Sequence, residues 1–245
     1  MVERADRAAV STFYAPGVWG ARAELDEAAA HHAGVKRLAI GDPVRLTSGD
    51  GRRSAGHVAA LAKRKLIIAL DGPVERVAPL PRVELWAPVG DRDRMLLLAE
   101  KAVELGASAW RPIVYRRSRS VNPRGEGDAF REKLRLRMIS ALEQSGSAWL
   151  PASEPEAPLD AALAAGRAVD GILLDAGGAP LGALDGGLRA PIAIALGPEG
   201  GLDLDERAAF VAAGWRPASL GANVLRFETA GIAALAVVRS LMIDQ

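Results

Sequence analysis

Leu196-Gly-Pro-Glu-Gly-Gly-Leu-Asp-Leu-Asp-Glu206 is the stretch of the sequence that decides the fold. It begins at the end of an apolar run, Pro191–Leu196, that is typical of a buried parallel strand. Its three glycines let the main chain approach a ligand closely. Asp203 and Glu206 fit an acidic variant of the capping box, which predicts a helix directly after the loop. Taken alone, a tight connection without a ligand explains such a loop equally well.

A second stretch, Leu220-Gly-Ala-Asn-Val-Leu-Arg-Phe-Glu-Thr-Ala230, repeats this arrangement. It leaves a predicted strand at Pro217–Leu220 and enters an apolar helix, for which Thr229 is the predicted N-cap. Arg226 and Glu228 flank Phe227 and, without another glycine loop nearby, would be interpreted as a surface ion pair. Because ligands in α/β sheets collect at the carboxyl ends of strands, two such loops together favour a ligand site.

The segments before these loops alternate between strand and helix patterns. Strands are predicted at Val83–Val89, Trp110–Tyr115 and Gly171–Asp175. Helices are predicted at Arg94–Leu105, ended by Gly106, and at Phe130–Ser145. This alternation predicts an α/β domain over residues 81–245, with a parallel sheet covered on both faces.

Residues 1–80 form a separate small module in this interpretation. Strands are predicted at Val44–Leu46, His57–Leu61 and Lys65–Leu70, the first two as a hairpin, and a helix from Glu24 to about Leu38. The Pro-containing stretch Pro73–Pro81 is the predicted linker. The N-terminal domain is therefore expected to be small and rich in β-structure.

The composition excludes cysteine-dependent sites, and the distribution of apolar residues argues against a signal segment or a membrane span. The chain has 245 residues, 49% of them hydrophobic, and no cysteine, which excludes disulfides, thiolate metal sites and cysteine nucleophiles. No apolar signal segment opens the chain, and the run Ala230–Leu241 is broken by Arg239 and too short to span a bilayer. We expect a cytoplasmic protein without a membrane partner. His31 and His32 lack a third nearby ligand, so no metal is expected and the pair is interpreted as hydrogen-bonding residues.

Positive charge is concentrated in one segment, although the formal net charge is only +1. The segment from Arg111 to Arg137 holds nine basic residues against three acidic ones, a local charge of +6. Charge runs are usually solvated helix faces. The position of this segment on the α/β domain instead favours a surface that contacts phosphates and positions RNA without reading its sequence.

With these motifs in view, the sequence resembles the RsmE family, which methylates N3 of a uridine in small-subunit ribosomal RNA. The two loop stretches carry the resemblance. Further similarity lies at Glu100–Gly106, Arg117–Ser120, Glu143–Gly146, His31–Arg37 and Gly41-Asp42. The chain departs from the family pattern at Ser147, where a basic residue is usual, and in an N-terminal extension that displaces Phe13-Tyr-Ala-Pro16.

The resemblance implies a fold, a cofactor and a partner. It implies a SPOUT-type α/β domain with a trefoil-knotted parallel sheet, a small N-terminal PUA-like β-barrel domain that binds RNA, and a homodimer. S-adenosylmethionine is the implied cofactor, and 16S ribosomal RNA, in the small ribosomal subunit, the implied partner. The implied cofactor-binding residues are Leu196, Gly197, Glu199, Gly200, Gly201, Leu220, Gly221, Ala222, Val224, Leu225, Glu228 and Thr229.

The chemistry of the implied reaction suggests roles for individual residues. A sulfonium donor is already activated, so the protein must align the acceptor nitrogen and manage its proton. A guanidinium can stabilise the negative charge of a deprotonated uridine imide, and Arg226 is the first candidate and Arg119 the second. Glu199 and Glu228 are candidates either for assisting proton transfer or for holding polar groups of the cofactor. The candidate RNA-binding residues are Arg37, Arg94, Arg116, Arg117, Arg119, Arg124, Arg131 and Arg135.

The sequence alone leaves three other functions to be considered. One is a different knotted RNA methyltransferase that acts on transfer RNA or on a ribose hydroxyl. Another is a catalytically inactive RNA-binding factor for ribosome assembly, against which the intact Gly-Pro-Glu-Gly-Gly stretch argues. A Rossmann or P-loop enzyme is disfavoured because neither glycine motif of those folds is present.

Overall fold

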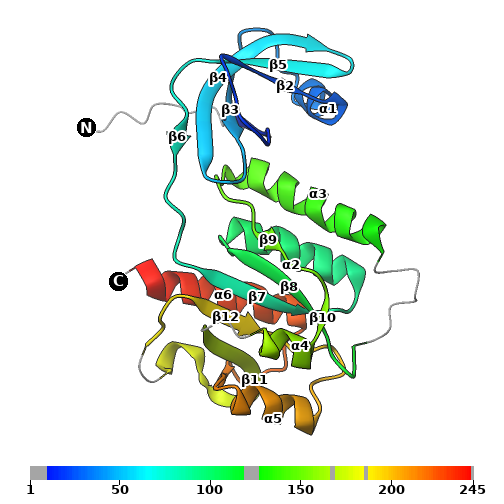
Figure 1. The fold of residues 1–245 in the computed structure, drawn as a ribbon, viewed down its shortest axis with the longest axis vertical. Coiled ribbons are helices and arrows are strands. Elements are labelled where there is room, and N and C mark those ends of the chain that lie inside the picture. The colour runs from blue at the N-terminus through cyan, green and yellow to red at the C-terminus, as the bar shows by residue number, and fades with distance from the viewer. Residues whose placement is uncertain (1–9, 119–126, 166–168, 185–186, 244–245) are drawn as a thin grey trace. The chain divides into compact units, whose positions relative to one another are not determined.

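The computed structural model describes residues 10–118, 127–165, 169–184 and 187–243. It divides into two compact units, which are described separately (Figure 1). The first unit contains the chain up to Pro79 together with Leu142–Leu150, and the second contains Leu80–Ala141 and the chain from Pro151 onward. The sequence did not predict that 142–150 belongs with the N-terminal unit.

The first unit is built on a mixed sheet with the strand order β1-β3-β4-β5-β2, and β6 pairs with β4. Its elements are β1 (Ser11–Tyr14), β2 (Arg22–Leu25), α1 (Glu27–Val35), β3 (Pro43–Thr47), β4 (Arg52–Ala62), β5 (Lys65–Leu70) and β6 (Glu75–Arg76). Strands β3 and β4 pair antiparallel, which confirms the predicted hairpin, and β5 confirms the predicted strand. The core of this sheet includes the fully buried side chains Phe13, Leu46, Val58, Leu66 and Ile68.

Three expectations for this unit need correction. The helix is shorter than predicted, because Glu24 lies in β2 paired with β5, and the Asp26 side chain caps α1 by accepting the N–H of Ala29. The expected linker holds the short strand β6. His32 makes an edge contact with the Phe13 ring, and its buried Nε2 has no hydrogen-bond partner among the described residues. Burial lowers the pKa of His32, which favours the neutral ring.

Residues 142–150 complete the first unit through main-chain contacts. The amide of Leu150 donates to the carbonyl of Gly49, and the amide of Gly51 donates to the carbonyl of Ala148. The Glu143 carboxylate accepts the N–H of Tyr14 at 2.8 Å. A Cβ on Gly51 would lie 2.4 Å from the Trp149 ring, so only glycine fits there.

The second unit is an α/β domain with a parallel sheet in the order β10-β8-β7-β12-β11-β13, and β9 pairs with β8. Its strands are β7 (Val83–Pro88), β8 (Ala109–Val114), β9 (Ala152–Ser153), β10 (Ala157–Pro158), β11 (Asp170–Pro180), β12 (Ile192–Ala195) and β13 (Arg216–Ser219). Its helices are α2 (Arg92–Glu104), α3 (Asp128–Ser145, whose end belongs to the first unit), α4 (Leu159–Ala164), the 3₁₀ turn η1 (Leu181–Ala183), α5 (Leu204–Ala212) and α6 (Phe227–Ile243). The predicted parallel sheet is confirmed, because the apolar runs are its buried strands.

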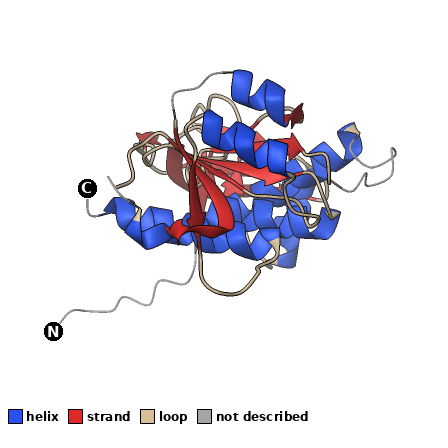
Figure 2. Cartoon of the chain, turned by 90° about the horizontal axis from the view of Figure 1, so that it is seen from below, coloured by secondary structure: helices blue, strands red, loops and turns tan. Residues whose placement is uncertain are grey.

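Helices cover both faces of this sheet (Figures 1 and 2). On one face α6 packs against α2 and against β7 and β12. This packing is close enough that a Cβ on Gly231 would lie 2.7 Å from a methyl carbon of Leu98. On the other face, Phe210 of α5 and Leu159 of α4 share an apolar cluster with Trp86 and Trp215.

Two helix ends in this unit were anticipated and one was not. Gly106 has φ +74°, as predicted for a left-handed cap after α2. Asp203 and Glu206 form the predicted capping box at the start of α5. The prediction that Thr229 caps α6 is wrong, because the helix begins at Phe227 and the Ala230 amide already donates to the Arg226 carbonyl. Thr229 therefore lies in the first turn.

Candidate functional site

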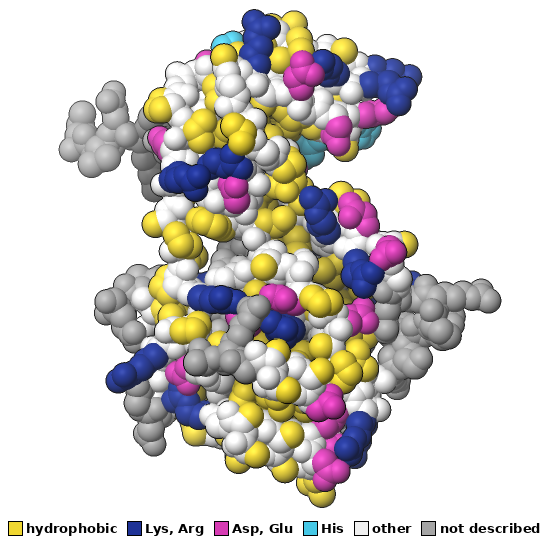
Figure 3. Space-filling model, in the orientation of Figure 1, with side chains coloured by type: hydrophobic (Ala, Val, Ile, Leu, Met, Phe, Trp, Pro, Cys, Tyr) yellow, Lys and Arg dark blue, Asp and Glu magenta, His cyan; other side chains and the backbone are white. Residues whose placement is uncertain are grey.

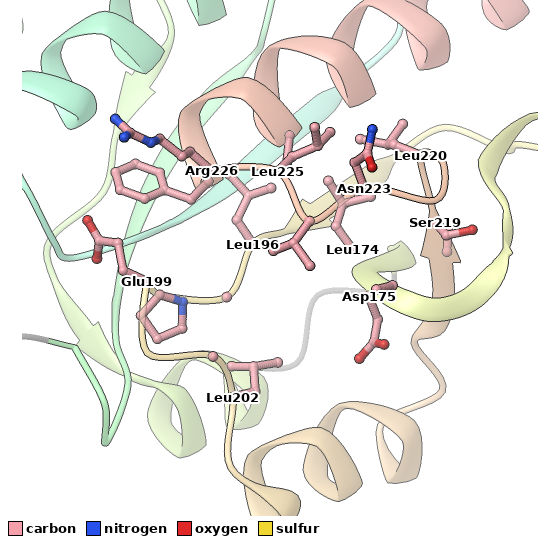
Figure 4. Close-up of a pocket in the computed structure, with 18 of the residues that line it drawn as sticks. Leu174, Asp175, Leu196, Glu199, Leu202, Ser219, Leu220, Asn223, Leu225 and Arg226 are labelled. Atoms are coloured by element: carbon pink, nitrogen blue, oxygen red, sulfur yellow. The ribbon is translucent and has the colours of Figure 1, made fainter.

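A cavity of about 470 Å³ opens at the carboxyl ends of β12 and β13, beside the middle of β11 and at the start of α6 (Figure 4). β11 lies between β12 and β13 in the parallel sheet, and Leu173 and Leu174 of β11 pair with residues near the ends of these two strands. Leu174 lines the cavity from β11, Leu196 from the end of β12, and Ser219 from β13. The two glycine loops singled out in the sequence thus form two walls of one cavity.

The first wall is the 196–203 loop, which follows β12. Gly201 has φ +72°, a conformation that side-chain-bearing residues rarely adopt. A Cβ on Gly200 would lie 3.1 Å from the Cβ of Arg117 and 3.3 Å from its carbonyl oxygen. Gly200 is therefore needed for the close approach of the segment after β8. The capping box at Asp203 fixes the point where the loop enters α5.

The second wall is the 219–226 loop, which joins β13 to α6. Gly221 has φ +146°, and every residue from Gly221 to Arg226 is exposed. Val224 is 91% exposed and Leu225 is 39% exposed, although both are apolar and both line the cavity. Apolar side chains that remain open to solvent at a cavity are typical of a surface that a ligand covers.

Arg94 of α2 connects residues of the two loop motifs. Its guanidinium lies 3.2 Å from Glu199 and 3.8 Å from Glu228. Glu228 is only 6% exposed, and its Oε2 atom has no hydrogen-bond partner among the described residues. Arg94 is thus the nearest compensating charge for a buried carboxylate. The close packing of Glu199 also explains Gly90, where a Cβ would lie 2.9 Å from Oε2 of Glu199.

The segment after β8 braces the outside of the 196–203 loop. Arg116 pairs with Asp203 and Asp205 at 2.9 Å each, and its amide donates to the Glu206 carboxylate. The Arg117 guanidinium donates to the Gly200 carbonyl at 3.2 Å. The amide of Glu206, together with Arg116, lowers the pKa of Asp203, and the two aspartates raise the pKa of Arg116. The charges at this corner therefore stabilise one another in their ionised forms.

The predicted cofactor-binding residues fall into two groups. Those that line the cavity are Leu196, Gly197, Glu199, Gly201, Leu220, Gly221, Val224 and Leu225. Those that lie beside it without lining it are Gly200, Ala222, Glu228 and Thr229. Of the candidate catalytic residues, Arg226 and Glu199 line the cavity and lie on the same side of it in Figure 4, whereas Arg119 falls outside the described residues.

The candidate RNA-binding arginines are dispersed and mostly paired. Arg37 is exposed in the first unit, with φ +56°. Arg131 and Arg135 pair with acidic residues one turn away on α3, at Asp128 and Glu132. Arg124 lies outside the described residues. Arg111, at the start of the basic segment, is only 7% exposed and lies among Glu84, Glu154 and the Trp86 ring, so it is a core cation rather than part of a surface.

Basic and acidic side chains also alternate on the visible surface of the second unit (Figure 3). A large share of the local charge of +6 is therefore compensated by acidic residues from elsewhere in the fold, such as Glu100 beside Arg137. The basic segment is a weaker candidate for a continuous phosphate-binding surface than its sequence suggested.

Several cavity residues were missed by the sequence analysis. They are Leu174, Asp175, Ala176, Pro198, Leu202, Arg207, Ala218, Ser219, Asn223, Phe227 and Ala230. The signal for Asp175 was present, because it ends a predicted strand and strand ends collect ligands. The sequence around Arg207 gave no such signal, because its position on α5 beside the cavity depends on the tertiary fold.

The described part of the chain shows no group of three or more His, Asp or Glu side chains placed to hold a metal ion. Over the same residues, no helix has both the length and the apolar character needed to cross a bilayer.

Comparison with known proteins gives one consistent result. The sequence profile of the RNA methyltransferase domain matches residues 78–239. The ribosomal RNA small subunit methyltransferase E of Rickettsia conorii is 27% identical over 231 residues, which cover 89% of this chain and 90% of that protein.

Solved structures agree with the sequence relatives. The ribosomal RNA small subunit methyltransferase E of Neisseria gonorrhoeae, bound to S-adenosyl methionine, superimposes with a TM-score of 0.84 at 25% identity, covering 95% of this chain and 98% of that one. A putative methyltransferase of Legionella pneumophila in complex with the same cofactor superimposes with a TM-score of 0.83 at 25% identity, covering 94% and 97%. The similarity therefore extends over both units.

Proposed function

Because the chain belongs to the RNA methyltransferase family, with the RsmE enzymes as its relatives, we propose that it transfers a methyl group from S-adenosylmethionine to N3 of a uridine in 16S ribosomal RNA. The observation that carries this proposal is the cavity formed by the two glycine loops at the carboxyl ends of β12 and β13, the parallel strands on either side of β11. The relatives named above supply the substrate class, and the uridine N3 position is the finer part of the proposal.

The cavity fits a nucleoside-containing cofactor. Its volume of about 470 Å³ lies within the usual range for small-molecule sites. Leu174, Leu196 and Leu202 offer apolar surface for a flat base, while Gly197 and Gly201 leave main-chain atoms accessible for hydrogen bonds. Val224 and Leu225 gain burial when a ligand fills the space.

In the proposed reaction the protein aligns the acceptor and stabilises charge. S-adenosylmethionine, when bound, supplies an activated sulfonium methyl group. Arg226 stabilises the negative charge that develops on the uridine ring as its N3 proton leaves. Glu199, held by Arg94 at 3.2 Å, lies on the same side of the cavity and is the proposed group for handling that proton. Arg119 is a second candidate cation, outside the described residues.

The RNA is proposed to be held by cations of both units. Arg37 belongs to the N-terminal unit, and Arg117 lies beside the 196–203 loop. Arg116, Arg131 and Arg135 already have acidic partners, so their contribution to phosphate contacts is expected to be small. Arg94 is proposed to act on the cofactor loops rather than on RNA, because both its ion pairs involve loop-motif carboxylates.

The finer architecture is part of the same proposal. We propose that the parallel sheet is threaded as a SPOUT trefoil knot, that the N-terminal sheet is a PUA-like β-barrel, and that the protein works as a cytoplasmic homodimer. The support is the similarity of both units to the RsmE structure of Neisseria gonorrhoeae and to the methyltransferase structure of Legionella pneumophila, at TM-scores of 0.84 and 0.83. Sedimentation of the purified protein tests the dimer, and a monomer at micromolar concentration would contradict it.

One experiment separates the proposed function from its alternatives. The protein is incubated with labelled S-adenosylmethionine and either naked ribosomal RNA or small subunits lacking the modification, and the product is mapped by mass spectrometry. N3-methyluridine in 16S ribosomal RNA is the expected result. A methyl group on transfer RNA or on a ribose hydroxyl would indicate a different target, and RNA binding without any methyl transfer would indicate an assembly factor.

A further inference from the structure

We propose that Asp175, paired with Arg207, forms a subsite of the cavity that binds the two vicinal hydroxyl groups of a ribose. The inference rests on the proposed function, because it assumes that a nucleoside cofactor occupies this cavity. It assigns a role to a carboxylate that lies outside both loop motifs. Figure 4 shows Asp175 of β11 between Leu202 on one side and Ser219 on the other, and in the strand it follows Leu174, the last residue before the shift in pairing with β13.

A bulge in β11 presents this carboxylate to the cavity. Leu174 pairs with Ala218 of β13, and Ala179 pairs with the same residue, so residues 175–178 are extra in the strand. Gly178 is required in the bulge, since a Cβ there would lie 2.4 to 2.7 Å from the backbone of Pro217 and Ala218. Bulges beside active sites commonly redirect a side chain. Here the bulge begins at Asp175, which among the described residues is the only charged strand residue that lines the cavity.

The Asp175 carboxylate is buried and held in a fixed position. Its side chain is 7% exposed, and Oδ2 lies 2.5 Å from the guanidinium of Arg207. Oδ1 accepts the amide of Gly177 at 2.8 Å. An ionised carboxylate has about four acceptor positions. These two bonds therefore leave acceptor positions for a ligand in the cavity that Asp175 lines.

The ion pair with Arg207 decides which ligand groups suit these positions. Arg207 already neutralises the charge of Asp175, so an ammonium group placed there would also face the guanidinium at short range. Neutral hydroxyl groups donate to the carboxylate without that repulsion. A carboxylate is also the group that accepts a ribose hydroxyl in Rossmann dinucleotide sites. A vicinal diol is therefore favoured over the amino-acid end of the cofactor.

The test measures ligand affinity by calorimetry with S-adenosylhomocysteine and its 2′,3′-dideoxy analogue. In the unchanged protein the analogue is expected to bind about 10- to 100-fold more weakly, because hydrogen bonds to a charged group are lost. In Asp175→Ala the two ligands are expected to bind within about twofold of each other. A purely structural role for Asp175 would weaken both ligands equally and preserve the ratio, which would overturn the inference.

Two further variants make the result decisive. Asp175→Asn keeps the side-chain volume and is expected to lose most of the discrimination, even where Asp175→Ala does not fold. Asp160→Asn changes an exposed aspartate on α4 and is expected to keep the full ratio. Failure of the unchanged protein to bind S-adenosylhomocysteine would reject the cofactor itself. Tight binding with an unchanged ratio in Asp175→Asn would reject only the ribose subsite.

Discussion

The two walls of the cavity differ in how firmly contacts within the protein hold them in place. The 196–203 loop is held by the Asp203 capping box, by Arg94 on Glu199 and by Arg117 on Gly200. The 219–226 loop is exposed over all six residues from Gly221 to Arg226. Contacts within the protein preorganise the first wall, whereas the second is expected to become buried when a ligand binds. We therefore expect changes in the first wall to affect cofactor affinity, and Arg226 in the second to affect turnover.

The largest expected effect follows from replacing Arg226 with Ala. Arg226 is exposed, and its guanidinium makes no hydrogen bond or ion pair with the described residues, so cofactor affinity is expected to stay within about threefold. Turnover is expected to fall by about 10²- to 10³-fold, since one charge-stabilising group is lost. Single-turnover methylation and calorimetry measure the two quantities. Arg226→Lys serves as the control that keeps the charge, and near-normal methylation by Arg226→Ala would remove this residue from the mechanism.

The preorganised wall is tested next by Gly200→Val. The added side chain meets the Cβ and the carbonyl oxygen of Arg117, so the loop must move. Cofactor affinity is expected to fall by at least about 100-fold, because a displacement of about 1 Å in a binding loop is costly. Gly182→Val is the matched control, since a Cβ on Gly182 meets nothing within 4 Å. Equal affinity in the two variants would show that the loop is not preorganised.

Arg94→Ala tests the connection between the walls and is expected to have an intermediate effect. It removes the nearest cation from the buried Glu228 carboxylate and frees Glu199. Cofactor affinity is expected to fall about tenfold, with a lower melting temperature, because a buried carboxylate loses its compensation. Arg64→Ala, which breaks an exposed pair with Glu27, is the control. A variant that loses only RNA affinity would restore the sequence-based assignment of Arg94 to phosphate binding.

The smallest effect is expected from Asp203→Ala, which removes one half of the capping box. Loss of an N-cap lowers helix stability, and a fall of a few degrees in melting temperature is expected. Because the folded pKa of Asp203 is lowered, its stabilisation is complete above the unfolded pKa of about 3.9 and is lost as the pH falls through the folded value. The difference between variant and parent should therefore shrink below about pH 4. A difference that grows in acid would contradict the assignment.

Local patterns predicted the elements of the second unit well. The apolar run at Pro191–Leu196 became β12, and the acidic pair Asp203 and Glu206 became a capping box, because both signals act within a few residues. The Thr229 cap failed because a residue with a good capping side chain can also sit in a first turn when the preceding backbone is already helical.

Such local patterns cannot predict ion pairs between residues that are far apart in the sequence. Nothing near Arg111 in the sequence indicates that Glu84 and Glu154 would surround it, so a core cation was counted as surface charge. Arg207 could not be placed opposite Asp175 before the helix and the bulge were known. The two glycine loops could be identified from the sequence because each loop's glycines stand directly between a strand pattern and a helix pattern.

Because residues 142–150 belong to the first unit, this unit depends on chain that follows much of the second unit in the sequence. This matters both for truncated fragments and for folding during translation. A fragment that stops at residue 80 lacks the chain that supplies the partners of Gly49, Gly51 and Tyr14. Such a fragment is expected to be less stable than the same region in the whole chain. During translation, likewise, the amino-terminal unit stays incomplete until more than half of the protein has left the ribosome.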